Sequence, residues 1–469
     1  MSSSRTGAPV AYLPSKEKKR VRFPCPAQDL GYNELMKNWL VKLKSEKLVG
    51  IGLGVIIIGA ILFRFIHFEK RFHFTGDQAL ASARAYEIWQ NKELTLVGIP
   101  ITSWTYEGKS AHVSSTAYYI QLIPLLLSGF EPRVASMIMA GGAVLMTAVL
   151  YMGVKKLTKS KTVGLVMAAI YGLLPLYIDY SIFLWNPNWQ LLLAPVAIFL
   201  MGWYEEKKRP IILGLAGLVL GLMLTLHFQF GLVVFGLMII YFLVLKKRHS
   251  LSDFWYLLGG LGVGFSPMIL AEIKTGFYNT KILGAILGQL LTSKNGVNFL
   301  GGIAPHYLMV SGLFVTLGLV IWGRKYLNKV LVGGLILVLL VIDMVIYLPQ
   351  PAQAWQLPIG WFYQNELTVH EIMVEKKLTN FNILNLAYIE PLANVQKYLL
   401  QVNEPQIYKL LANDYYVNDY LFVMAKNWEE VTTAENYEVR ELVGSLVESW
   451  PIGEGYELFL LERKVKSDG

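Results

Sequence analysis

The stretch FTGDQALASARAY, residues 74–86, combines reactive side chains with the signals of a helix start. Thr75 and Gln78 have the spacing of a capping box, in which each side chain bonds the backbone of the other residue. Asp77 then falls in the first helical turn, where the helix dipole and free N–H groups favour its ionised form. The sequence therefore predicts a carboxylate that either stabilises the helix start or acts on a substrate.

Other polar residues stand at the ends of apolar segments, where they could bind an anionic substrate. Arg84 follows Asp77 by two turns on the same helix face, although Glu87 is near enough to form a solvated ion pair with it. In DYSIFLWNPNW, Asn186 and its following proline predict a turn, and the two tryptophans are typical of an aromatic belt. His227 stands at a helix end in LHFQF. Each is a candidate binding residue or an ordinary interfacial one.

A further pair of charges follows an apolar segment in FSPMILAEIKTGFYN, namely Glu272 and Lys274. A carboxylate near membrane depth is energetically costly, which suggests a function. The alternative is that its side chain snorkels into the interface, outside the hydrocarbon. Both residues are candidates for substrate binding.

Motifs for metal and nucleotide chemistry are missing from the sequence. It contains no closely spaced histidine pair, HExxH, CxxC, P-loop or GxSxG, and no GxGxxG opens a helix after a strand. Its one cysteine, Cys25, can form no intramolecular disulfide. We therefore predict no protein metal cluster, although a divalent cation is left open as a cofactor, and we expect no soluble nucleotide chemistry.

Composition identifies the elements that must position these residues as membrane helices. Of 469 residues, 54% are hydrophobic and 16% charged, against about 25% charged in soluble domains. The mean hydropathy is +0.44. The net charge of +9 is concentrated in a basic tail and short loops, which favours contact with membrane lipids over nucleic-acid binding. The sequence predicts a mainly α, polytopic helical bundle in the cell membrane.

The positive-inside rule orients this bundle. The segment 116–130 is short for a span and contains a proline. If it is an interfacial helix and does not cross the membrane, all five basic clusters of the chain fall on the same side of the membrane. We then predict about nine spans, with the N-terminus inside and the C-terminus outside. The predicted spans are 48–68, 134–154, 162–180, 189–204, 210–227, 229–245, 254–271, 306–322 and 329–348.

Three regions follow from this topology. Residues 1–47 form a basic cytoplasmic tail, and 48–348 form the transmembrane module, with a long first outer loop at 69–133. Residues 349–469 form an extracytoplasmic domain, where short mixed runs such as DYLFVMA predict strands among helices, a small α+β fold. Because the inner loops are short, we place the function at the outer face.

One span followed by FTGDQALASARAYEIW resembles the GT-C superfamily of integral-membrane glycosyltransferases. The nearest branch contains protein O-mannosyltransferases and the lipid A aminoarabinose transferase (family 39). The stretch VGIPITSW…EGKSAHVSSTAYYIQLIPLLLSGF resembles that branch's interfacial helices, and FLWNPNWQLLLAPV resembles the segment before its fourth span. SPMILAEIKTGFYNTKIL and FNILNLAYIEPLANVQKYLL are similar to its later outer segments.

The resemblance implies transfer of a sugar from a polyprenyl-phosphate donor, with inversion at the anomeric carbon. The acceptor would be a lipid, glycan or protein at the extracytoplasmic face. Asp77 would act as base or orient the acceptor hydroxyl, and the cationic side chains of Arg84, Lys109, His112 and Lys274 would face the phosphate.

This chain departs from the family pattern at two places. Asn186 stands where relatives often have a second aspartate, and Asp179 lies seven residues earlier; the sequence around His112 lacks the family's usual proline. The alternative function is a transporter or flippase for lipid-linked saccharides. Transporters typically show repeats and charges at mid-membrane, whereas here Asp343, near a span end, is the main charge within the spans.

Overall fold

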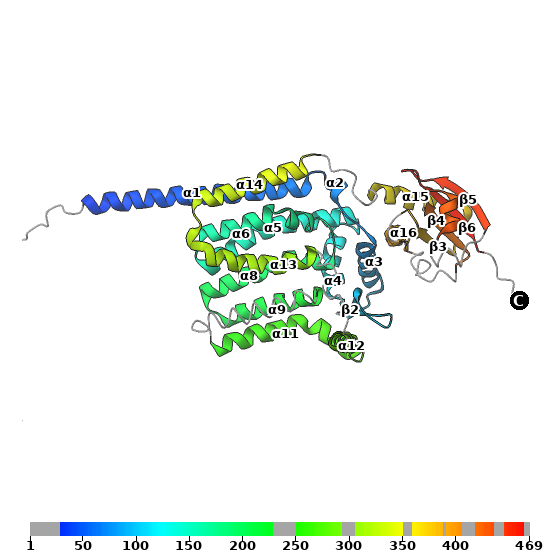
Figure 1. Cartoon of the computed structure of the whole chain (residues 1–469), viewed down its shortest axis with the longest axis horizontal. Helices are drawn as coiled ribbons and strands as arrows, with labels where there is room; N and C mark the ends of the chain where they lie inside the picture. The colour runs from blue at the N-terminus through cyan, green and yellow to red at the C-terminus, as the bar shows by residue number, and fades with distance from the viewer. Residues whose placement is uncertain are drawn as a thin grey trace, which may run out of the picture. The chain divides into compact units, whose positions relative to one another are not determined.

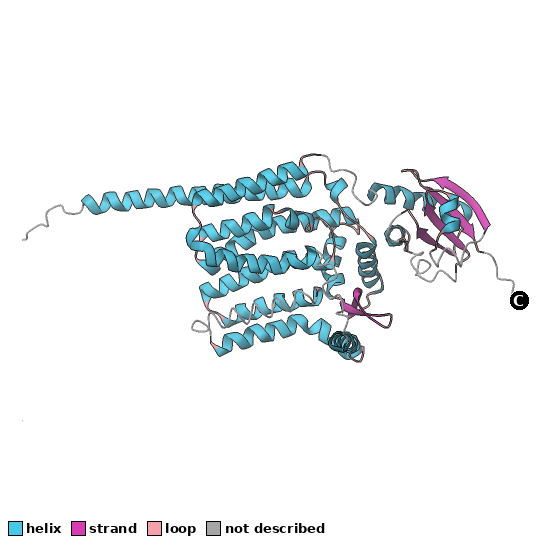
Figure 2. Ribbon diagram, in the orientation of Figure 1, coloured by secondary structure: helices cyan, strands magenta, loops and turns pink. Residues whose placement is uncertain are grey.

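The computed structural model describes residues 29–227, 250–292, 305–349, 359–387, 391–405, 418–435 and 445–463. The chain forms two compact units, Met1–Gly50 and Ile51–Gly469. The first contributes the start of the long helix α1 (Asp29–Phe65), and all later elements belong to the second. Helices predominate, and Figure 2 shows strands only in a hairpin and in a C-terminal sheet among the described residues.

Apolar helices make up the main body of the second unit (Figure 1). After α1 these are α5 (Pro132–Thr158), α6 (Lys161–Leu173), α8 (Trp189–Lys207), α9 (Pro210–Leu226), α11 (Leu251–Lys274), α13 (Pro305–Trp322) and α14 (Lys329–Tyr347). Neighbouring helices pack in the order α11, α9, α8, α5, α6, α14, with α13 against α6 and α8. The core between them is built from buried aliphatic and tyrosine side chains such as Leu150, Met167, Tyr171, Leu213 and Leu313.

Glycines allow α9 and α11 to approach with their backbones in contact. A Cβ atom on Gly217 would lie 2.1 Å from the carbonyl oxygen of Leu257. One on Gly260 would lie 1.9 Å from the carbonyl oxygen of Gly214. Such close packing through small residues is common where helices associate in membranes.

The helices agree with most predicted spans in position. Within the described ranges, four helices are long and apolar enough to cross a membrane: Glu46–Phe65, Pro132–Thr158, Leu251–Lys274 and Lys329–Tyr347. Three shorter apolar helices, Thr116–Leu127, Lys161–Leu173 and Pro210–Leu226, accompany them. The predicted span 229–245 and tail residues 1–28 lie outside the described residues. The structure thus confirms a mainly helical, multi-span protein, while nine spans and the orientation remain predictions.

The predicted first outer loop, 69–133, contains three helices and a β-hairpin, and the hairpin differs from the expectation. Helices α2 (Phe68–Arg71), α3 (Gly76–Asn91) and α4 (Thr116–Leu127) lie in it. Between α3 and α4 the chain forms a β-hairpin of β1 (Val97–Tyr106) and β2 (Lys109–Ser114), where the family resemblance had implied interfacial helices. The hairpin is favoured by β-branched residues in alternation and by Gly108, whose φ of +74° suits the turn.

The described residues of 359–463, here called the C-terminal segment, form a small sheet with three helices. Its elements are α15 (Ile359–Lys376), β3 (Phe381–Asn385), α16 (Asn394–Asn403), β4 (Tyr420–Ala425), α17 (Trp428–Thr433), β5 (Ser445–Pro451) and β6 (Glu457–Glu462). The strand order is β3-β4-β6-β5; β3 and β4 are parallel and the other pairs antiparallel. This confirms the strands among helices that the sequence predicted there.

Strands β3, β4 and β6 are largely buried on both faces, which explains the continuous apolar runs in β4 and β6, whereas the edge strand β5 is mostly exposed. One face, with Phe381, Phe422 and Leu460, packs in the same core as Trp361 of α15 and Tyr398 of α16. That core continues into Phe68, Phe72 and Phe74 of the first outer loop. The opposite face packs on Val431 of α17.

Candidate functional site

Helix α3 begins as the sequence predicted, and it presents Asp77 to solvent. The backbone N–H of Thr75 donates to Oε1 of Gln78 at 2.8 Å, and the Thr75 hydroxyl contacts the same oxygen. Gln78 is buried by this arrangement, whereas Asp77, the residue before it, is exposed. Among the described residues Asp77 has no hydrogen bond or ion pair, so its carboxylate is free to act on a substrate.

The pKa of Asp77 moves in the direction opposite to the expectation. We predicted that the helix start would favour the ionised carboxylate, but desolvation by the surrounding protein raises the pKa of Asp77 above its usual value of 3.8. A carboxylate with a raised pKa is a stronger base than an ordinary aspartate.

Aromatic side chains fix the chain just before Asp77. The rings of Phe68, Phe72 and Phe74 stack in series, with centroid separations of 5.7 and 6.3 Å. The ring of His73 meets the ring of Phe183 edge to face at a centroid distance of 5.5 Å. The short link from α2 to α3 is therefore held by aromatic contacts, which limit the movement of the helix start.

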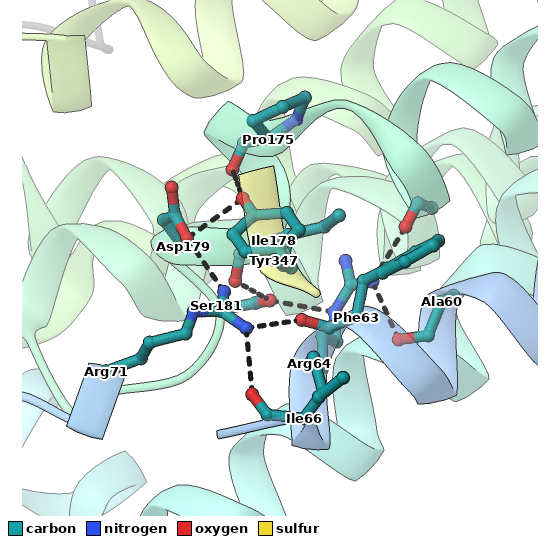
Figure 3. A network of polar contacts seen from close by, with 11 residues as sticks. Ala60, Phe63, Arg64, Ile66, Arg71, Pro175, Ile178, Asp179, Ser181 and Tyr347 are labelled. Atoms are coloured by element: carbon teal, nitrogen blue, oxygen red, sulfur yellow. Dashed lines mark hydrogen bonds and ion pairs between the residues drawn. The ribbon is translucent and has the colours of Figure 1, made fainter. Parts of the chain in front are cut away.

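Arg71, six residues before Asp77, is the centre of a polar cluster that joins three helix ends (Figure 3). Its guanidinium donates to Oδ1 of Asp179 at 2.8 Å and lies 4.0 Å from the ring centre of Tyr347. The Tyr347 hydroxyl donates to the same Asp179 oxygen at 3.0 Å. Arg71 also donates to the carbonyl oxygens of Phe63 (2.5 Å) and Ile66 (3.3 Å) at the end of α1.

Arg64 lies next to this cluster and is fully buried. It donates to Oγ of Ser181 at 2.9 Å and to the carbonyl oxygen of Gly172 at 2.8 Å (Figure 3). A longer bond of 3.3 Å reaches the carbonyl oxygen of Tyr171. In a helix the carbonyl of Tyr171 would accept from the N–H of residue 175, but Pro175 has no N–H group. The guanidinium of Arg64 donates to this carbonyl instead.

Asp343 is a second buried ionisable group near this arginine. It is fully buried in α14, and neither of its oxygens has a hydrogen-bond partner among the described residues. It interacts electrostatically with Arg64, Arg71 and Asp179. Two arginines and two aspartates therefore gather near the ends of α1, α2, α7 (Pro175–Asp179) and α14.

The hairpin and the end of α11 bring together several of the predicted binding residues. The backbone N–H of His112 donates to Oδ1 of Asn279 at 2.7 Å, and the Asn279 amide donates back to the His112 carbonyl at 3.0 Å. Glu272 accepts from the backbone N–H groups of Asn279 (3.1 Å) and Thr280 (2.9 Å) at the start of α12 (Tyr278–Thr292). The carboxylate of Glu272 is thus used to begin α12, and His112 is anchored through its backbone.

The predicted cationic residues have different surroundings. Arg84 is ion-paired with Glu87, as the alternative interpretation of the sequence proposed. Lys109, at the start of β2, and Lys274, at the end of α11, are exposed, and neither forms an ion pair with a described residue. These two lysines belong to the hairpin and to the α11–α12 corner, which contact each other.

Asn186 and His227 lie side by side at one end of α9. The Asn186 amide donates to the carbonyl oxygen of Leu226 at 3.4 Å, and His227 is the next residue. The carboxylate near the fourth predicted span is instead Asp179, which binds Arg71 and Tyr347. In the part of the chain that the structure describes, no three histidine, cysteine or acidic residues gather in a way that could hold a metal ion.

Sequence reasoning missed the roles of Arg64, Arg71 and Tyr347. Arg64 carried a usable signal, because a charged residue inside an apolar stretch is costly and needs a partner. Asp343 offered the same signal in α14, so the two could have been paired from sequence. Arg71 and Tyr347 offered none, since a charge and a tyrosine at a span end are ordinary interfacial residues.

Known proteins resemble this chain in sequence family and, distantly, in structure. Residues 114–270 match the model of the family described as dolichyl-phosphate-mannose-protein mannosyltransferase. The oligosaccharyltransferase of Archaeoglobus fulgidus with zinc and sulfate is 13% identical, with a TM-score of 0.39 over 86% of this chain and 72% of that one. Its apo form is 13% identical, with a TM-score of 0.31 over 75% and 47%. No curated protein matches the chain in sequence.

The family match confirms the resemblance to GT-C glycosyltransferases that the sequence indicated. It covers the chain from the end of β2 to α11, which includes Asp179, Asn186 and His227. Together with the apolar helices, it supports membrane glycosyl transfer as the class of function.

Proposed function

We propose that the chain transfers a sugar from a polyprenyl-phosphate donor to an acceptor hydroxyl at the extracytoplasmic face of the cell membrane. Asp77 orients the acceptor or removes its proton as the hydroxyl attacks the anomeric carbon, with inversion. The observation that carries this proposal is the exposed carboxylate of Asp77, which has no partner among the described residues and stands at a helix start held by aromatic contacts. Its raised pKa suits a general base better than an ordinary aspartate would.

The leaving group is a lipid phosphate, whose negative charge needs cations or amide donors near the membrane plane. Lys109 and Lys274 are exposed and free of acidic partners within the described residues, so we assign them to this phosphate. The binding roles of Arg84, His112, Asn186, His227 and Glu272 remain part of the proposal. The donor sugar is a hexose or a pentose, and the acceptor is a lipid, a glycan or a protein.

The test is a transfer assay on the purified chain in liposomes, with radiolabelled polyprenyl-phosphate sugars and an extract of cell-envelope acceptors. The label is followed in two ways, as product bound to acceptor and as donor that has moved between leaflets. A transferase gives labelled product that depends on acceptor. Movement of donor between leaflets without labelled product from any donor would refute the proposal and support the transporter alternative.

A further inference from the structure

Helix α16 of the C-terminal segment packs directly on helix α3, which carries Asp77. Close to this contact lies Tyr398, a fully buried residue of α16. Its ring lies 5.4 Å from the ring of Phe74, and Phe74 stands three residues before Asp77. A side chain from late in the sequence therefore touches the segment that begins the helix of the proposed base.

The hydroxyl of Tyr398 fixes a second point on the same assembly. It donates to the carbonyl oxygen of Phe130 at 2.5 Å, in the corner between α4 and α5. Phe130 has a φ of +66°, in the left-handed region that a bulky residue adopts only when its surroundings hold it there. The Phe130 ring in turn meets the edge of Tyr86, in the third turn of α3, at 4.9 Å.

These contacts bracket α3 along its buried face. Phe74 precedes the helix and Tyr86 lies further along it, and both are linked to Tyr398, directly or through Phe130. Asp77 is on the opposite, exposed face, so Tyr398 does not touch it. Removing the hydroxyl would leave the ring contact with Phe74 but free the Phe130 corner, and α3 would lose one of the contacts that hold it.

We propose that Tyr398 is a positioning residue for Asp77, so that the C-terminal segment is a working part of the site. This inference rests on the proposed role of Asp77 in transfer. A displacement of about 1 Å in a reacting group can lower a rate by about 100-fold, and loss of one support should produce part of that effect.

A matched control is available in the neighbouring helix. Tyr363 of α15 also donates its hydroxyl to this corner, to the carboxylate of Glu131, but neither the Phe74 ring nor the carbonyl of Phe130 is among its partners. Tyr398→Phe and Tyr363→Phe therefore each remove one hydroxyl from the same interface, and only Tyr398→Phe removes one that supports α3. We expect kcat for transfer, corrected for folded protein, to fall about 10-fold in Tyr398→Phe and less than about 2-fold in Tyr363→Phe, with KM for the donor unchanged in both.

A second measurement does not depend on activity. The chain has a single cysteine, Cys25, so a Cys25→Ser, Asp77→Cys background has one reactive thiol at the site. Adding Tyr398→Phe should change the rate of maleimide labelling at position 77 by about 3-fold or more, and adding Tyr363→Phe should not. Unchanged labelling in Tyr398→Phe would overturn the positioning role, whatever happens to kcat. If Asp77→Asn transfers sugar normally, the proposed function fails, but the labelling result still reports on position.

Discussion

Arg64 offers a quantitative test of how the polar cluster is held together. Replacing it by leucine removes a fully buried guanidinium and leaves the oxygens of Ser181, Gly172 and Tyr171 without this donor. It also leaves Asp343 as a buried charge with one fewer cation nearby. Breaking a buried pair by removing one partner typically costs about 3–5 kcal/mol, and we expect a loss of stability in that range for Arg64→Leu.

The double variant Arg64→Leu, Asp343→Leu separates the two contributions. Because no uncompensated carboxylate remains, we expect it to regain about 1–3 kcal/mol over Arg64→Leu alone. The rest of the loss should persist, since the orphaned carbonyl oxygens at the end of α6 still lack a donor. Arg324→Leu, at an exposed position in η3 (Gly323–Tyr326), is a control that should change stability by less than about 0.5 kcal/mol.

Stability would be measured by unfolding the purified protein in mixed micelles as the fraction of denaturing detergent is raised. The reasoning is refuted if Arg64→Leu unfolds within about 1 kcal/mol of the wild type. It is equally refuted if the double variant is no more stable than Arg64→Leu, because Asp343 would then not be the balancing charge.

Three further outcomes follow from the structure. Transfer should decline as pH falls through a pKa above 3.8, because desolvation raises the pKa of Asp77 and only its ionised form is a base; a decline at an ordinary aspartate pKa would contradict this. Because the folded state raises the pKa of Asp77, folding favours the protonated carboxyl group. The stability that this protonation contributes is therefore present at low pH and is lost as the pH rises through the pKa of the folded state. Gly260→Ala should destabilise the folded protein by about 1–3 kcal/mol, since the new Cβ would lie 1.9 Å from the carbonyl oxygen of Gly214. The control Gly259→Ala should be nearly neutral, because no atom lies within 4 Å of its Cβ position. Equal unfolding midpoints for the two variants would refute the close packing of α9 and α11. Glu272→Ala should cost about 1 kcal/mol and speed amide exchange in the first turn of α12, because its carboxylate holds two N–H groups there; unchanged exchange would show that another group holds them.

The helices were predictable because hydropathy and basic loops act locally along the sequence. The capping box at Thr75 and Gln78 placed the start of α3 correctly, since both signals lie within one turn. The β-hairpin was missed because its segment was interpreted through the family resemblance, which implied helices there. Residues with only local neighbours were therefore easier to interpret than those that meet across the chain.

The contacts among Arg71, Asp179 and Tyr347 could not be foreseen, because they join residues that are far apart in the sequence. Asp179 is 108 residues from Arg71, and Tyr347 is 168 residues from Asp179, so no spacing in the sequence joins them. The contact of Tyr398 with Phe130, across 268 residues, is hidden in the same way. Only the packing of α1, α7, α14 and the C-terminal segment brings these side chains together.

The most direct test of the proposed function compares Asp77→Asn with Glu93→Gln in the liposome transfer assay. Both changes remove one exposed carboxylate charge from the region of α3, but Glu93 lies just past the C-terminal end of the helix. We expect Asp77→Asn to lower kcat by about 100-fold or more and Glu93→Gln to transfer like the wild type. Wild-type transfer rates in Asp77→Asn would contradict the central claim that this carboxylate is the base or orients the acceptor.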